Sequence, residues 1–318
     1  MSIPGPRWTC LLFTLALAAL PLPARGAEKV FTAEHKIRLP GGGFVAATET
    51  WTEAGAARSP RRAVILLNGS AFNRQHWAIP AKGYNGTTIL ARAGWFTFAV
   101  DFLGVGDSSK PADGTDADFD TQTEAMSAVV DYVRGLRGVP RVDLIGEGYG
   151  GGIAVRLAAN PRKVRSTVTA AMLYDSPPVA GPLTDPAFIG ILESSPDGYF
   201  FIPGAGSTIF MAGAPQAAID YVTATQGGSY PTPNFLAATD LPFFDATRAR
   251  APGLVIFGRQ DFIVGPHGVD GLVREYGPRG AVLAVRDDAG HAPRIERPEI
   301  ARWFWDRTLA FLERPRHP

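Results

Sequence analysis

The chain has 318 residues, of which 46% are hydrophobic and 19% are charged, and its net charge is +1. This balance provides enough apolar residues for a sizeable core and excludes global disorder. A nearly neutral chain without a basic block also argues against a nucleic acid or an acidic membrane surface as the partner.

The first 26 residues are typical of a secretory signal peptide. Arg7 precedes a short apolar run that begins at Cys10, and residues 24–26 fit the small-x-small rule for cleavage before Ala27. The run is short for a transmembrane helix, so we expect an exported protein, periplasmic or secreted, without a stable membrane span after cleavage; an uncleaved anchor is the alternative. Cys10 is the only cysteine, so cleavage would leave no disulfide and no thiol nucleophile.

The rest of the chain alternates between strand and helix patterns. Residues 32–51 alternate on both sides of a glycine turn, which predicts a β-hairpin. Apolar runs predict strands within 62–70, 95–108, 141–146, 167–177, 252–261 and 281–291. Helical patterns fall at 87–94, 121–137, 151–160, 268–277 and 298–314. This order predicts an α/β fold with a mostly parallel central sheet and helices on both faces.

The helix at 121–137 has the clearest pattern. Ala125, Met126 and Val129 belong to one apolar stripe at helical spacing. Thr121 and Glu124 have the spacing of a capping box, so we expect the helix to begin there.

One region interrupts the alternation. Residues 177–250 are rich in Gly, Pro, Ser and aromatic side chains, with weak helical pieces. A structureless loop of that length is implausible inside a compact domain. We therefore expect a core formed by 27–176 and 251–318, and an inserted cap at 177–250 over the carboxyl edge of the sheet, where ligands bind in such folds.

Five segments, taken in order, resemble motifs of the α/β-hydrolase family. They are LLNGS (66–70), DFLGVGDS (101–108), GEGYGGG (146–152), VIFGRQDFIV (255–264) and DDAGHAP (287–293). The resemblance covers nearly all of the chain after residue 26. In the same order, the resemblance implies a loop of the oxyanion hole, the family's D-x-x-G-x-G-x-S loop, and a nucleophile elbow. The last two segments would be the strand end that presents an acid and the loop that presents a histidine.

The resemblance assigns catalytic roles to two residues. His291 takes the place of the family's general base, and Asp261 takes the place of the acid that orients it. Asp175 is a second candidate for the acid, because some family members place it after the preceding strand. The histidines are scattered and no set of cysteines exists, so neither a metal site nor a cofactor is predicted.

The oxyanion loop and the elbow supply further candidates. Asn68 replaces the histidine that is usual in the loop, and Ser70 would offer its backbone N–H and, as a second donor, its hydroxyl. The other N–H would come from Tyr149, at a helix N-terminus that favours negative charge. His76 and Glu147 are additional candidates for the pocket.

Gly148 occupies the position of the nucleophilic serine. Glycine adopts the positive φ of an elbow without steric cost, so the turn would persist while the attacking oxygen is absent. Three interpretations follow: an enzyme that uses the His291–Asp261 dyad without a serine, a non-catalytic ligand-binding pseudo-hydrolase, or a serine esterase whose nucleophile was lost or replaced. The aromatic residues of 177–250 suggest a small to medium apolar or aromatic ester-like substrate, although core packing also accounts for them.

Overall fold

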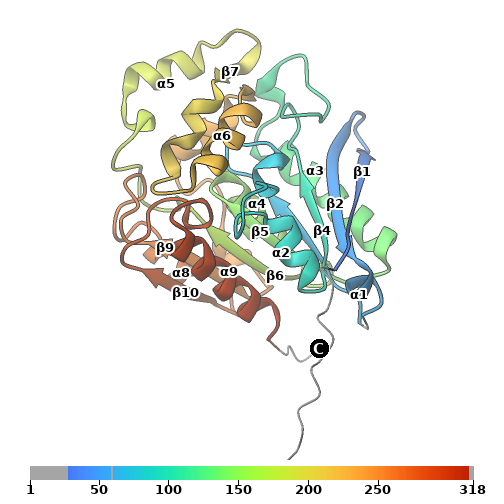
Figure 1. Cartoon of the computed structure of the whole chain (residues 1–318). Coiled ribbons are helices and arrows are strands. Elements are labelled where there is room, and N and C mark those ends of the chain that lie inside the picture. Colours follow the sequence, from blue (N-terminus) through green and yellow to red (C-terminus); the bar gives the residue numbers. More distant parts are fainter. Residues whose placement is uncertain (1–27, 59, 315–318) are drawn as a thin grey trace, which may run out of the picture.

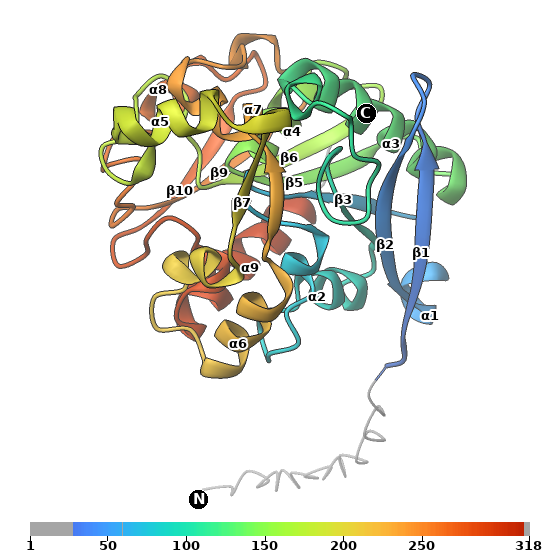
Figure 2. The ribbon, with the colours of Figure 1, turned by 90° about the horizontal axis from the view of Figure 1, so that it is seen from above.

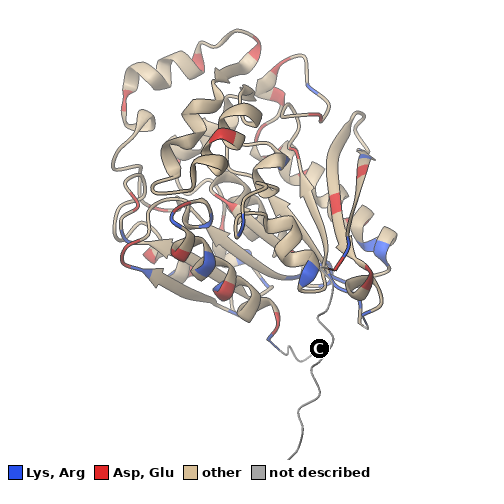
Figure 3. Ribbon diagram, viewed as in Figure 1, with Lys and Arg blue, Asp and Glu red and all other residues tan. Residues whose placement is uncertain are grey.

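A computed structural model of the protein describes residues 28–58 and 60–314 (Figure 1). The predicted signal peptide, residues 1–26, lies outside the described residues. No helix within the described ranges is both long enough and apolar enough to cross a membrane. Acidic residues (red) and basic residues (blue) are both scattered over the ribbon (Figure 3).

Eight strands of the described chain form the central sheet. In spatial order they are β1 (Val30–Arg38), β2 (Phe44–Thr52), β4 (Phe96–Val100), β3 (Ala63–Leu67), β5 (Val142–Glu147), β6 (Val164–Ala170), β9 (Gly253–Gly258) and β10 (Ala281–Arg286). Strand β2 is antiparallel to β1 and β4, and all other neighbouring pairs are parallel. Every residue of β3, β4, β5 and β9 is buried, as expected of parallel strands covered on both faces.

Helices cover both faces of this sheet. The α-helices of the described chain are α1 (Glu53–Ala56), α2 (Gly86–Arg92), α3 (Phe119–Arg137), α4 (Tyr149–Leu157), α5 (Pro186–Glu193), α6 (Gln216–Thr225), α7 (Pro233–Leu236), α8 (Asp270–Glu275) and α9 (Pro298–Leu312), of which α5, α6 and α7 belong to the segment between β6 and β9. Successive side chains of β3 point to opposite faces, so Ile65 packs in the cluster of Met126 from α3, whereas Leu66 packs in the cluster of Phe304 from α9. Helices α3 and α4 lie on one side of the sheet and α2 and α9 on the other (Figure 2). The predicted α/β architecture is confirmed.

The start of α3 differs from the sequence-based expectation. The helix begins at Phe119, and Asp118 is its N-cap, because the Asp118 carboxylate accepts the backbone N–H of Thr121 at 2.8 Å. The predicted capping box of Thr121 and Glu124 is therefore wrong, since Thr121 lies inside the first turn. The predicted end is correct: the helix stops at Arg137, and Gly138 follows with a φ of 62°.

Strand β6 is shorter than the predicted strand at 167–177. It ends at Ala170, and Ala171 turns the chain away from the sheet with a φ of 56°. Asp175 therefore does not follow the strand directly.

Besides short 3-10 helices, the segment between β6 and β9 contains three α-helices and two short strands. They are α5, β7 (Tyr199–Ile202), α6, β8 (Gly228–Pro231) and α7, and β7 pairs with β8 in a separate antiparallel sheet. In Figure 1 the elements α5, β7 and α6 lie above the central sheet, at the top of the molecule. The predicted insertion at 177–250 falls within this segment.

Candidate active site

Gly148 forms a sharp turn between β5 and α4. Its φ of 50° and ψ of −120° lie in the left-handed half of the map, where glycine carries no Cβ penalty. A Cβ at Gly148 would be 3.5 Å from the nearest neighbouring atom, the carbonyl oxygen of Ala171. By contrast, a Cβ at Gly146 or Gly150 would come within 2.4 Å of a backbone oxygen. The crossing of α4 over β5 thus requires Gly146 and Gly150, whereas at Gly148 there is room for a side chain.

His291 and Asp261 form a hydrogen-bonded pair. Asp261 follows β9 and is buried, and its Oδ2 is 2.8 Å from Nδ1 of His291. Its Oδ1 accepts the backbone N–H groups of Ile263 and Val264, both at 2.9 Å. The carboxylate is therefore fixed by the loop that follows its strand. When Nδ1 of His291 donates to this carboxylate, Nε2 carries the lone pair and can act as a base.

The loop that presents His291 is fixed by a residue that sequence reasoning missed. Both carboxylate oxygens of Glu296 accept the backbone N–H of Gly290, at 3.0 and 2.9 Å. Burial is the main cause that raises the pKa of Glu296 above its ordinary value. In the sequence, only the closeness of Glu296 to His291 could have suggested this role. A contact between a side chain and the backbone of the same loop leaves no residue pattern.

Asp175, the second candidate for the acid, forms neither a hydrogen bond nor an ion pair with His291 in the described part of the chain. It is exposed and forms an ion pair with Arg274 of α8, at 3.4 Å. It also does not line the cavity described below. Of the two candidates, only Asp261 is the carboxylate partner of His291.

The oxyanion loop differs from the expectation in one respect. The hydroxyl of Ser70 donates to the backbone carbonyl of Asn234, at 2.6 Å, so it is not directed toward a substrate oxygen as predicted. Ser70 and Tyr149 both line the cavity. Tyr149 is the first residue of α4, where backbone N–H groups have no acceptor within the helix. The backbone donors remain the candidates for the oxyanion hole.

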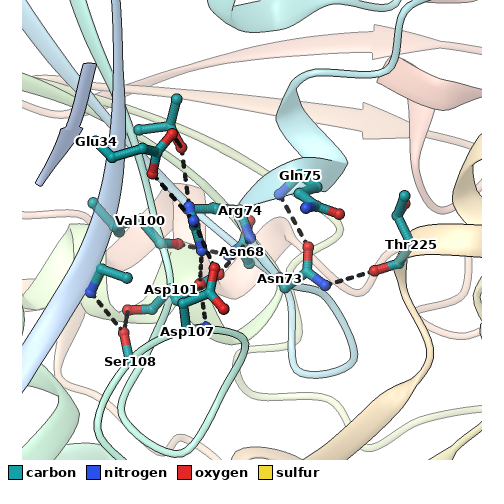
Figure 4. A network of polar contacts seen from close by, with 12 residues as sticks. Glu34, Asn68, Asn73, Arg74, Gln75, Val100, Asp101, Asp107, Ser108 and Thr225 are labelled. Atoms are coloured by element: carbon teal, nitrogen blue, oxygen red, sulfur yellow. Dashed lines mark hydrogen bonds and ion pairs between the residues drawn. The ribbon is translucent and has the colours of Figure 1, made fainter. Parts of the chain in front are cut away.

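Asn68 fixes the oxyanion loop and does not line the cavity. Its side-chain Nδ2 donates to the carbonyl of Val100 at the end of β4, at 2.7 Å (Figure 4). The backbone carbonyl of Asn68 accepts the backbone N–H of Gly150, at 3.1 Å. Asn68 therefore connects the end of β4 to the first turn of α4.

The Asp-Gly loop after β4 is fixed by a charge network (Figure 4). Arg74 forms ion pairs with Asp101, Asp107 and Glu34, and its backbone N–H donates to Asp101 at 2.6 Å. Burial raises the pKa of Asp101, and the Arg74 guanidinium opposes this shift. Asp101 and Ser108 are thus structural: the Ser108 hydroxyl donates to the Asp101 carbonyl, at 3.0 Å.

A buried ion pair connects the elbow to the histidine loop. Arg294 is fully buried and binds both carboxylate oxygens of Glu147, at 2.9 and 2.7 Å. Its Nη2 is also 2.7 Å from Nδ1 of His76, and its guanidinium lies 4.0 Å from the ring of Trp77. Glu147 precedes Gly148 and Arg294 follows His291 by three residues, so this pair fixes the two loops relative to each other.

His76 does not act as a pocket base in this arrangement. It is fully buried, stacks on Phe72 with ring centroids 3.8 Å apart, and does not line the cavity. Burial, and then the charge of Arg294, lowers the pKa of His76 well below its ordinary value, so the ring is neutral. Arg294 was missed from the sequence because its partner Glu147 is distant along the chain.

Gly148 and His291 line one cavity of about 150 Å³. The remaining lining is mostly apolar and comes from the strand ends and from the segment between β6 and β9. It includes Phe72, Leu173, Leu183, Phe210, Phe235, Phe243 and Ile263, with Glu147, Ser70, Tyr149 and Asn234 as side chains with polar atoms beside His291. The ring of Phe210 lies 5.0 Å from that of His291. Within the described ranges, no group of three or more His, Cys, Asp or Glu side chains is arranged to bind a metal ion.

A sequence model described as "Alpha/beta hydrolase family" matches residues 64–302. The chain belongs to the α/β-hydrolase family. A search of curated protein sequences found no match. This α/β-hydrolase is similar in fold to a hydrolase from Pseudomonas aeruginosa PA01 (17% identity, 88% of this chain and 98% of the other, TM-score 0.66).

Two esterases have the same fold. An esterase from Exiguobacterium antarcticum is 16% identical, with 89% of this chain and 100% of the other covered and a TM-score of 0.67. A carboxylesterase from Bacillus subtilis is 16% identical, with 89% and 92% covered and a TM-score of 0.62. At such identities the likeness establishes the fold and leaves the activity to be argued from the site.

Proposed function

We propose that this α/β-hydrolase is a hydrolase-like enzyme that uses the His291–Asp261 dyad without a serine nucleophile. The observation that carries the proposal is the 2.8 Å hydrogen bond between His291 and Asp261, at a cavity that both His291 and Gly148 line. The mostly apolar cavity supports a small to medium apolar or aromatic ester-like substrate.

The proposed reaction is direct attack by water. Nε2 of His291 removes a proton from water, and the oxygen forms a bond to the ester carbonyl carbon. The backbone N–H groups of Ser70 and Tyr149 stabilise the oxyanion, and Asp261 stabilises the imidazolium. The bond to the leaving oxygen then breaks, and His291 returns the proton to that oxygen. Without covalent catalysis, the oxyanion donors and substrate binding would give a rate about 10³–10⁴-fold above that in water, and the general base His291 would add to this.

Two further parts of the proposal concern the whole chain. The N-terminal pattern supports export to the periplasm or medium, with residues 1–26 removed. The segment between β6 and β9 contributes Phe210, Asn234 and Phe235 to the cavity wall, which supports its role as a cap over the site.

Removal of His291 tests the proposal. We expect the purified protein to hydrolyse a short aryl ester slowly, and His291→Ala to reduce this turnover by about 10²–10⁴-fold, the usual contribution of a general base. His267→Ala is the matched control, because the His267 side chain is 78% exposed and pairs only with Asp270. Equal activity of His291→Ala and the parent would contradict the dyad.

A non-catalytic binder is the second candidate, favoured by the absence of an oxygen at Gly148. It predicts that an apolar ester raises the melting temperature while mass spectrometry detects no product. A fluorophosphonate probe distinguishes the two candidates from an esterase with a displaced serine, because it would label only the latter.

A further inference from the structure

Two polar side chains that line the cavity have buried atoms without a partner among the described residues: the hydroxyl of Tyr149, and the carboxamide of Asn234, which alone leaves two such atoms. Asn234 lies on α7 and is 2% exposed, and it lines the cavity together with Gly148 and His291. Both Nδ2 and Oδ1 of its carboxamide are buried, and neither has a hydrogen-bond partner among the described residues. Buried polar atoms are nearly always paired, so two unpaired atoms on one side chain require an explanation.

The fold itself does not explain the carboxamide. The contact that fixes α7 to the oxyanion loop uses the backbone carbonyl of Asn234, which accepts the Ser70 hydroxyl at 2.6 Å. Any residue at this position would provide that carbonyl. An apolar side chain of similar size would fill the same volume without the desolvation penalty that an unsatisfied buried polar group carries.

The position of Asn234 restricts what its carboxamide binds. The Ser70 contact places Asn234 next to the loop that offers the oxyanion N–H. The ligand group that binds the Asn234 carboxamide is therefore close to the carbonyl under attack and not at the distant end of the ligand. A carboxamide offers a donor and an acceptor side by side. The group that satisfies both is one that also presents an acceptor beside a donor, as amides do and simple esters do not.

The cavity volume restricts the remainder of the ligand. About 150 Å³ is close to the volume of an apolar cavity that binds benzene. The surrounding Phe, Leu and Ile side chains favour an apolar ring or short chain.

We propose that Asn234 is the specificity residue of this cavity and that it selects a small aromatic or apolar amide over a simple ester. This inference rests on the proposed function in that it takes the same cavity as the substrate site. Its test uses equilibrium binding, so it does not depend on turnover.

Three probes of nearly the same shape isolate the contribution of Asn234. Benzamide offers a donor and an acceptor, acetophenone offers an acceptor only, and α-methylstyrene offers neither. Their dissociation constants are measured calorimetrically with the parent, Asn234→Leu and Thr308→Val. Thr308 is the matched control, because its buried hydroxyl also has no partner among the described residues but does not line the cavity.

The readout is the ratio of the α-methylstyrene to the benzamide dissociation constant, because this ratio cancels general changes in cavity shape. We expect Asn234→Leu to lower the ratio about tenfold or more, with acetophenone intermediate, since two hydrogen bonds to the ligand are lost. Thr308→Val leaves the ratio unchanged. If Asn234→Leu does not fold, Asn234→Ala retains the backbone carbonyl and has the same expected result.

An unchanged ratio in the Asn234 variants overturns the inference, as does a parent that binds none of the probes. A shifted ratio in a protein that hydrolyses nothing supports Asn234 as the recognition residue while the proposed chemistry fails. The two proposals therefore fail separately.

Discussion

Gly148→Ser is the substitution that most directly tests whether the elbow still has a working geometry. The new Cβ would lie 3.5 Å from the carbonyl oxygen of Ala171 and 3.9 Å from Cα of Gly69, which are ordinary contact distances. The side chain therefore fits without displacement of the backbone. The oxygen would enter the cavity that His291 also lines.

The expected magnitudes follow from the backbone and the dyad. A residue other than glycine at a φ of 50° costs about 1–3 kcal/mol, and the loss of glycine's freedom in the unfolded chain offsets about 0.4–1 kcal/mol of this. We therefore expect a decrease in melting temperature of a few degrees. A complete triad contributes about 10⁶ in turnover, and a misplacement of about 1 Å removes about 10² of that. Gly148→Ser should thus exceed His291→Ala about 10⁴-fold in ester turnover, and should exceed the parent by a smaller factor of up to about 10², because His291 already acts as a base in the parent.

The assay is kcat/KM on a short aryl ester, together with labelling by a fluorophosphonate probe. Gly148→Ala is the control, because it introduces the same Cβ and the same strain without an oxygen. Labelling and the increase in turnover above that of the parent should appear in Gly148→Ser only, and His291→Ala in that background should abolish both. A folded Gly148→Ser protein that is neither labelled nor active would refute the reasoning, because the loops would then be displaced by more than the missing atom.

Two further predictions concern the buried charges around the site. Arg294→Met leaves Glu147 buried without its partner and should reduce the free energy of unfolding, measured in urea, by about 3–5 kcal/mol. The double variant Arg294→Met with Glu147→Gln should recover part of this loss, and equal stabilities of the single and double variants would contradict the pairing. His76 is neutral in the folded protein because burial and the charge of Arg294 lower its pKa, and Glu147 lies 3.9 Å away. In the unfolded chain His76 takes up a proton below its ordinary pKa of 6.5. Its contribution to stability is therefore present above pH 6.5 and is lost toward pH 5, by at most about 1.4 kcal/mol per pH unit, and His76→Gln should make the measured pH slope correspondingly flatter.

Most of the fold was readable from local patterns. The apolar runs that became β3, β5 and β9 are buried on both faces, so each could be recognised without knowledge of its neighbours. The glycines of the elbow indicated a close crossing, and the structure gives the reason at Gly146 and Gly150, where any Cβ would meet backbone.

The sequence-based predictions were wrong where the contacting residue is distant in the sequence, or where two residues could each serve as the helix cap. Asp118 caps α3 in place of Thr121, and a carboxylate one turn earlier could not be ranked against a plausible capping box. The Ser70 hydroxyl is bonded to Asn234, 164 positions away. Arg294 likewise pairs with Glu147 at a separation of 147 positions. Only a folded chain reveals such contacts.

The buried carboxylate of Asp261 is the strongest physical argument for chemistry rather than simple binding. Removing a carboxylate from water is expensive, and apolar side chains of similar volume often replace buried ion pairs with no loss of stability. A wall for an apolar ligand therefore does not need Asp261, which is only 4% exposed and uses both oxygens to hold His291 and its own loop. What the carboxylate provides is an imidazole with a fixed orientation, in which Nε2 can accept a proton, and this arrangement favours the dyad proposal. The dyad interpretation accounts for this cost, and the binder interpretation leaves it without a purpose.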